Sequence, residues 1–336
     1  MDLNLTWFLL FGLLVAVYAV LDGFDLGVGV LSLFLPREDD RKTCMAAVAP
    51  VWDGNEVWLL TAGASLFAAF PPVYASVFSG FYLAFFLLLA ALIARAVSIE
   101  FRNVLEARPW RRAFDLAFGL GSLLPAVLFG VAVGNVLRGL PIDQAGDFRG
   151  QFLDLLNPFS LLFGLLSLAM FLVHGALYLS LKTTGELKAM ATRHAKYAFV
   201  AFAVLWLATT VAAYVSDLLT AAVTRPLSWV VLAVLVIAFA ASRIFLARGS
   251  LGSAFVAFSV VIIASVGLVG LALYPNLVPS SLSKDFSLDI YHHSSSPTTV
   301  LTMLVIVAIG MPFIIAYTSW VYYVFRGPAR EGYDAH

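Results

Sequence analysis

Nine long apolar runs constrain this chain more than any other feature of its sequence. In lipid, every backbone N–H and C=O group must find its partner inside the protein, so only helices and closed barrels span a membrane. Barrel strands appear as ~10-residue segments of alternating polarity, whereas these runs are continuously apolar and long enough for spanning helices. We predict membrane-spanning helices near 6–34, 51–70, 77–101, 114–137, 159–181, 197–220, 227–247, 252–274 and 298–325.

The composition supports an all-α polytopic membrane protein. Of the 336 residues, 62% are hydrophobic and 12% are charged, whereas about 25% of the residues are charged in soluble domains. The 20 Lys and Arg residues balance the 20 Asp and Glu residues, which gives no indication of a nucleic-acid partner. No connection between the runs is long enough for a soluble domain. We therefore expect residues 1–336 to form a single integral membrane domain surrounded by lipid.

The Lys and Arg residues indicate the orientation, because they are enriched in cytoplasmic connections. One side of the predicted topology carries 15 of them and the other side carries 4, while Arg95 lies within a run. We therefore expect nine transmembrane helices with the N-terminus outside and the C-terminus in the cytoplasm. The cytoplasmic set is Arg37, Arg41, Lys42, Arg102, Arg108, Arg111, Arg112, Lys182, Lys188, Arg193, Lys196, Arg243, Arg248, Arg326 and Arg330, and the outer set is Arg138, Arg149, Arg225 and Lys284.

Four acidic residues lie within the first two apolar runs. Asp22 and Asp25 belong to the first run, and Asp53 and Glu56 are at the start of the second. Carboxylates at membrane depth are costly, and they commonly mark a pathway or a functional site. The i, i+3 spacing places each pair on one helix face, and the predicted orientation places both pairs in the cytoplasmic half. If the two faces meet, the four groups form a series that can pass protons inward from the cytoplasm.

A structural role for these acids is the alternative interpretation. They can pair with Arg95 or hydrogen-bond to Asn55, and Asp53 is close enough to a helix start to act as an N-cap. Asp22 and Asp25 lie too far inside their run to be caps. The residues alone therefore leave both a proton path and fixed ion pairs open.

Other polar residues within the runs are candidates for supporting roles. Arg95 needs a carboxylate partner; Glu100 is at i+5, outside ideal intrahelical reach, so an acid from the first two runs is an equal candidate. Trp58 lies deeper than an interfacial anchor prefers. We interpret His174 as a packing residue with a hydrogen bond, because Met170 on the same helix face cannot ligate the opposite side of a haem iron. The sequence contains no Cys/His metal cluster, so we expect no haem or metal on this chain.

Several motifs, in order along the chain, resemble those of one membrane-protein family. The most specific are Asp22-Gly23-Phe24-Asp25-Leu26-Gly27-Val28-Gly29 and Ala49-Pro50-Val51-Trp52-Asp53-Gly54-Asn55-Glu56-Val57-Trp58. Further matches lie at 68–75, 78–82, 156–159, 184–187, 274–281 and 317–320. Together they resemble subunit II of the cytochrome bd-type quinol oxidases over the whole chain. The moderate length and short loops are similar to the cyanide-insensitive branch of that family.

The resemblance implies a nine-helix subunit of the bacterial cytoplasmic (inner) membrane that pairs with a haem-bearing subunit I. In this family subunit I holds haems b and d, oxidises quinol and reduces O2 to water with protons from the cytoplasm. Subunit II is a scaffold that also contributes to proton delivery and, in some members, to an O2 route or a bound structural quinone. Small accessory subunits are further candidate partners. This chain would then be part of an oxidase without being catalytic alone.

The resemblance also implies roles for individual residues. The proton-path acids of the family correspond to Asp25 and Asp53, and the tryptophan of its O2 route corresponds to Trp58. Glu56 and His174 stand where other members carry Gln, which argues against an essential role for either residue. Two other functions compete with this one. A proton-coupled secondary transporter would use the same acids but would more often show inverted repeats or broken helices, and a purely structural subunit would hold the acids in ion pairs.

Overall fold

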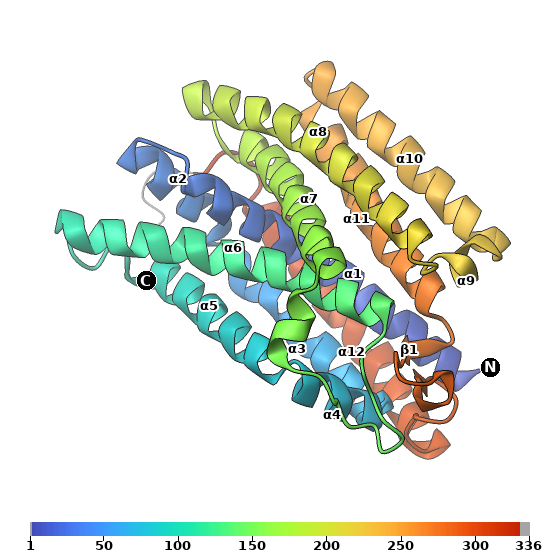
Figure 1. Cartoon of the computed structure of the whole chain (residues 1–336). Helices are drawn as coiled ribbons and strands as arrows, with labels where there is room; N and C mark the ends of the chain where they lie inside the picture. Colours follow the sequence, from blue (N-terminus) through green and yellow to red (C-terminus); the bar gives the residue numbers. More distant parts are fainter. Residues whose placement is uncertain (1, 330–336) are drawn as a thin grey trace.

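The computed structural model describes residues 2–329, which are almost entirely helical (Figure 1). The long helices are α1 (Leu3–Ser32), α3 (Trp52–Ala69), α5 (Tyr82–Phe101), α6 (Arg108–Arg138), α7 (Pro158–Lys182), α8 (Gly185–Val215), α10 (Pro226–Ala247), α11 (Leu251–Leu273) and α12 (Pro297–Val324). Shorter elements are α2 (Glu38–Val48), α4 (Pro71–Gly80), α9 (Thr220–Val223), two 3-10 turns (Phe152–Leu156 and Lys284–Phe286) and the antiparallel strands β1 (Asn276–Val278) and β2 (Leu288–Asp289). Arg330, which the charge count includes, lies outside the described residues.

Within residues 2–329, eight helices are long and apolar enough to cross a membrane, namely α1, α5, α6, α7, α8, α10, α11 and α12. The predicted run 51–70 corresponds to α3, which has 18 residues and is not among the eight. Its first five residues include Asp53, Asn55 and Glu56, which lower its hydropathy. The chain is thus an all-helical membrane protein with eight candidate spans, and α3 packs against α1 within the bundle.

The structure differs most from the predicted runs at three places. The run 77–101 is not one helix, because Phe81 separates α4 from α5 with a non-helical backbone (φ −97°, ψ 18°) and buries its ring in the core. Helix α8 begins 12 residues before the predicted run 197–220, because its polar first turns stay helical without being apolar. Helix α2 was not predicted; it is amphipathic and buries Cys44, Met45, Ala47 and Val48.

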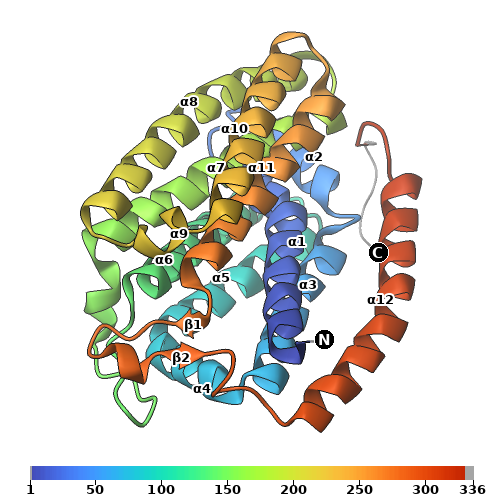
Figure 2. The same ribbon diagram turned by 90° about the vertical axis from the view of Figure 1, so that its right-hand side faces the viewer.

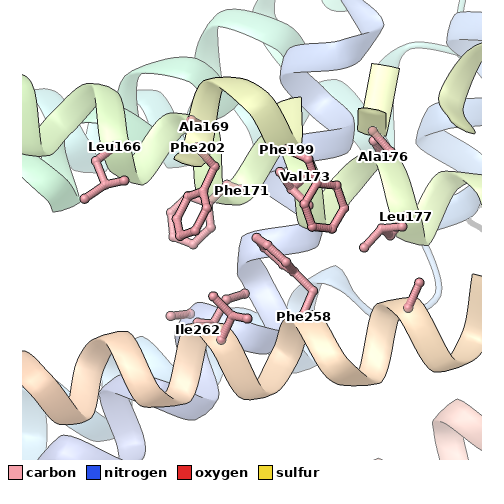
Figure 3. Packing of buried hydrophobic residues seen from close by; sticks show 14 of the residues in the cluster. Leu166, Ala169, Phe171, Val173, Ala176, Leu177, Phe199, Phe202, Phe258 and Ile262 are labelled. Carbon is pink, nitrogen blue, oxygen red and sulfur yellow. The ribbon is translucent and has the colours of Figure 1, made fainter. Parts of the chain in front are cut away.

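Helices α1 and α7 form the centre of the bundle and approach each other closely. A Cβ atom added to Gly27 would lie 1.9 Å from the backbone oxygen of Phe171, and one added to Gly175 would lie 2.5 Å from the backbone of Gly27. Only glycine permits this backbone contact. Beside it, Phe199 and Phe202 of α8 meet Phe258 of α11 edge-on at 5.3 and 5.6 Å (Figure 3).

The bundle has two distinct ends (Figure 1). The N-terminus, α4, α9 and the two strands lie at one end, and α2 and the end of α12 lie at the other (Figure 2). Helix α12 is at the margin beside α1 and α3, and within Pro297–Val324 only Val300 is buried. A long apolar helix with so little buried surface is available to lipid or to another subunit.

Candidate functional site

A buried ion pair joins helices α1 and α5. Asp22 on α1 and Arg95 on α5 are both fully buried. The guanidinium binds the carboxylate through two contacts, Nη2 to Oδ1 at 2.5 Å and Nη1 to Oδ2 at 3.0 Å. This bidentate geometry is the strongest that an Arg–carboxylate pair adopts. The side chain of Arg95 therefore points into the bundle, while Glu100, five residues later, is exposed on α5.

Two more carboxyl groups surround the same guanidinium. Asp25, one helical turn after Asp22, is fully buried, and its Oδ2 lies 3.9 Å from Arg95 Nη2. Glu56 on α3 is half-buried, and its Oε1 lies 3.5 Å from Arg95 Nη1. The cluster therefore contains one permanent cation and three acids. Two of the predicted acids of the first run and one of the second meet here.

Asp53 does not join this cluster. It lies in the first turn of α3 with its side chain exposed, whereas Glu56 faces the bundle. Two residues at i and i+3 point about 60° apart around a helix with 3.6 residues per turn. At the edge of the helix face that packs on the bundle, this angle is enough to bury one side chain and expose the other. The alternative that Asp53 caps the helix is wrong, because the N-cap position is Val51.

Asn55 and Tyr322 extend the cluster to the last helix. The Asn55 amide donates to Asp25 Oδ2 at 2.7 Å and to the Leu21 backbone oxygen at 3.1 Å. The Tyr322 hydroxyl of α12 donates to Asn55 Oδ1 at 2.8 Å. The sequence offered only a partial signal for these two residues. Asn55 belongs to the motif at 49–58, but Tyr322 is one of several aromatic residues in an apolar run.

Several polar atoms of the cluster are buried without a hydrogen bond. Within the described residues, Asp25 Oδ1, Glu56 Oε1, Arg95 Nε and the Tyr18 hydroxyl are buried without a hydrogen bond. Buried polar groups are nearly always hydrogen-bonded to protein or to ordered water. The buried oxygens of Asp25 and Glu56 can therefore accept a proton or a water molecule.

Trp58 and His174 lie near the cluster in apolar surroundings. Trp58 is buried on α3 with Leu14, Tyr18 and Ala62. His174 Nε2 lies 3.0 Å from the Val20 oxygen, and its ring stacks on Phe255 at 4.4 Å. Among the described residues, no group of three or more His, Cys, Asp or Glu side chains has the geometry to hold a metal ion.

Known proteins similar to this chain identify its family. Residues 3–325 match the family described as cytochrome bd terminal oxidase subunit II. The chain is 36% identical to cytochrome bd-I ubiquinol oxidase subunit 2 of Escherichia coli strain K12, covering 97% of this chain and 94% of the relative. It is 32% identical to cytochrome bd ubiquinol oxidase subunit 2 of Bacillus subtilis strain 168, covering 95% of each.

The fold agrees with that assignment. A chain from the structure of bd oxidase from Geobacillus thermodenitrificans superimposes with a TM-score of 0.79 and covers 97% of this chain and 99% of its own length, at 18% identity. The predicted resemblance is confirmed, and the chain belongs to the cytochrome bd terminal oxidase subunit II family.

Proposed function

We propose that this chain, as subunit II of a respiratory ubiquinol oxidase, supports a haem-bearing subunit I and delivers protons to it from the cytoplasm. The names of the relatives support the ubiquinol oxidase activity. The haems of subunit I supply the electron transfer that oxidises quinol and reduces O2 to water. The observation that carries the proton role is the grouping of three acids around one guanidinium.

The charge balance of the cluster requires a proton. Asp22, Asp25 and Glu56 would together carry three negative charges against the single positive charge of Arg95. An uncompensated buried charge is destabilising by several kcal/mol, so the cluster retains protons on its carboxyl groups. Asp22 holds the bidentate pair with Arg95. Asp25 and Glu56 are the groups that exchange protons.

Asp53 is the proposed entry point of this path. It is exposed in the first turn of α3, and Glu56 lies one turn further along the same helix. A proton that arrives at Asp53 moves by water to Glu56 and then to Asp25. The exposure of Asp53 suits exchange with the cytoplasm, and the burial of Asp25 suits delivery to a site shielded from water.

The proposed docking face for subunit I consists of α3 and α12, which contact each other. One side of α3 exposes Asp53, Val57, Leu60, Ala64 and Phe67, whose spacing of four and three residues is that of a helix-packing seam. Helix α12 adds a nearly unburied apolar surface to the same side of the bundle. A partner on this face would turn α3 into a ninth span enclosed by protein, although its start is polar.

The nine-span topology and the orientation belong to the same proposal. The C-terminal end of α12 lies with α2 at one end of the bundle, and the start of α1 lies at the other (Figure 2). The basic connections favour the α2 end as the cytoplasmic one. Residues 1–336 would then form one domain in a bacterial inner membrane. A structural quinone, small accessory subunits, an O2 route past Trp58 and the cyanide-insensitive branch stay predictions from the resemblance.

Turnover of the purified complex tests the proton role. Asp25→Asn and Asp53→Asn are introduced, with Glu100→Gln as a control because Glu100 is exposed outside the cluster. We expect normal haem spectra in all three complexes. Quinol oxidase turnover should be at least tenfold lower in Asp25→Asn, with or without a similar loss in Asp53→Asn. Normal turnover and haem content in both Asp variants would show that the chain is a purely structural subunit.

A further inference from the structure

The hydrogen bonds around Asn55 determine which oxygen of Asp25 is available to a proton. Asn55 is buried on α3 and contacts three groups from two other helices. Its amide nitrogen is 3.1 Å from the Leu21 oxygen and 2.7 Å from Asp25 Oδ2, both on α1. Its amide oxygen is 2.8 Å from the Tyr322 hydroxyl on α12.

Chemistry allows only one orientation of the Asn55 amide. The backbone oxygen of Leu21 can only accept a hydrogen bond, so the amide nitrogen must face it. The NH2 group has two hydrogens, and the second one points to Asp25 Oδ2. Tyr322 then donates to the remaining amide oxygen. A reversed amide would set its oxygen against the Leu21 oxygen with no hydrogen between them.

The two oxygens of Asp25 therefore have different surroundings. Oδ2 accepts from Asn55 and lies 3.9 Å from the Arg95 guanidinium, and both neighbours disfavour a proton on this atom. Oδ1 is buried and has no hydrogen-bond partner among residues 2–329. We propose that Asn55 and Tyr322 are positioning residues that keep Oδ2 as an acceptor and leave Oδ1 as the single atom through which Asp25 gains and releases its proton. The inference rests on the proposed function, because it specifies how the proton-carrying acid is held.

This arrangement connects Asp25 to the margin of the bundle. Tyr322 is near the end of α12, whose other contacts with α1 and α3 are few. A shift of α12 that separates Tyr322 from Asn55 leaves the amide oxygen without its donor and frees the amide to turn. The orientation of the Asp25 carboxyl thus depends on the position of α12, a helix that makes few contacts with the rest of the chain.

Infrared difference spectra between acidic and alkaline pH test the assignment on the purified complex. The C=O stretching band of neutral Asp25 is identified as the band that Asp25→Asn removes. When Oδ1 carries the proton, the carbonyl oxygen is Oδ2, and its hydrogen bond from Asn55 lowers the stretching frequency. We expect the band to move to higher frequency in Asn55→Ala and by a smaller amount in Tyr322→Phe. Tyr323→Phe is the matched control, because Tyr323 is exposed and its ring faces Arg326.

Turnover and haem content accompany each spectrum. Asn55→Ala should lower turnover at least about tenfold, the lower end of the effect of one lost hydrogen bond to a charged group. A band that stays in place in Asn55→Ala would overturn the assignment. If Asn55→Ala does not assemble, Tyr322→Phe provides the test. An unshifted band in Tyr322→Phe would also overturn the assignment.

The same set of variants separates this inference from the proton path itself. Normal turnover in Asp25→Asn, together with a band that depends on Asn55, refutes the proton path and leaves the positioning intact. Lost turnover in Asp25→Asn, together with a band that is independent of Asn55, refutes the positioning alone. An absence of any band that Asp25→Asn removes refutes both.

Discussion

Replacement of Arg95 should destabilise the complex more than replacement of Asp22, although the two residues form one ion pair. Arg95 is the shared cation of three acids, whereas Asp22 is one of three anions around a single cation. In Arg95→Leu the three acids lose their only cation and must take up protons or repel one another. Breaking a buried pair in this way is destabilising by about 3–5 kcal/mol.

Asp22→Asn has a smaller expected effect for a geometric reason. The guanidinium loses its bidentate contact, but Glu56 remains at 3.5 Å and Asp25 at 3.9 Å. Once one of these two acids gives up its proton, its unit charge at about 4 Å contributes about 4 kcal/mol of attraction at an effective dielectric constant near 20. The loss is then close to that of one charge-assisted hydrogen bond, about 1.5–3 kcal/mol.

Thermal unfolding of the purified complex, followed by tryptophan fluorescence, measures the difference. A change of 1 kcal/mol shifts the Tm of a domain of 150–250 residues by about 2–4 °C, so Arg95→Leu should lie roughly 6–20 °C below the unmodified complex. Asp22→Asn should fall roughly half as far. Asp22→Asn combined with Arg95→Leu should be no worse than Arg95→Leu alone, because one acid fewer is then left without a cation. Equal losses in the two single variants, or additive losses in the double variant, would refute the idea of a shared cation.

Three other predictions concern parts of the chain outside this pair. Gly27→Ala should prevent assembly because its Cβ would lie 1.9 Å from a backbone oxygen, whereas Gly12→Ala, with nothing within 4 Å, should assemble normally; haem content of the purified membranes compares them. The hydrogen bond from Arg149 lowers the pKa of Asp143, so this contact contributes stability above the unfolded value of ~3.9 and loses it as the pH falls further. The protection factors of the amides in the loop at 139–149, which are corrected for the intrinsic exchange rate at each pH, should fall below that pH and stay constant between pH 5 and 8. Burial raises the pKa of the Cys44 thiol, so a maleimide should label Cys44 only after denaturation, and fast labelling of the native complex would contradict its burial.

The sequence predicted the helices whose apolar composition reflects the lipid around them. It did not predict features that depend on contacts between parts of the protein. Long apolar runs predicted α6, α7, α10, α11 and α12 to within a few residues, except that α6 begins six residues earlier than predicted. Hydropathy does not detect helical turns that are polar, so the start of α8 and all of α2 were missed. The break at Phe81 was missed because it depends on how its ring packs with distant loops.

The acid cluster shows the same limit at the level of single residues. The i, i+3 spacing correctly indicated that Asp22 and Asp25 share a face, and both are buried there. For Asp53 and Glu56 the same spacing was misleading, because a packed face is narrow and only Glu56 falls within it. The link from Tyr322 to Asn55 spans 267 positions, and no local pattern indicates a contact at that separation.

The shared cation also has a consequence for the order of synthesis. Asp22 and Arg95 are 73 positions apart, so α1 leaves the ribosome well before its counter-charge exists. At about 5–20 residues per second, the interval is roughly 4–15 s. During that time α1 has two acids and no arginine to neutralise them. It must wait beside the insertion machinery, or enter the lipid with both carboxyl groups protonated, until the fifth helix arrives. Formation of the ion pair between Asp22 and Arg95 would then favour retention of α5 in the membrane.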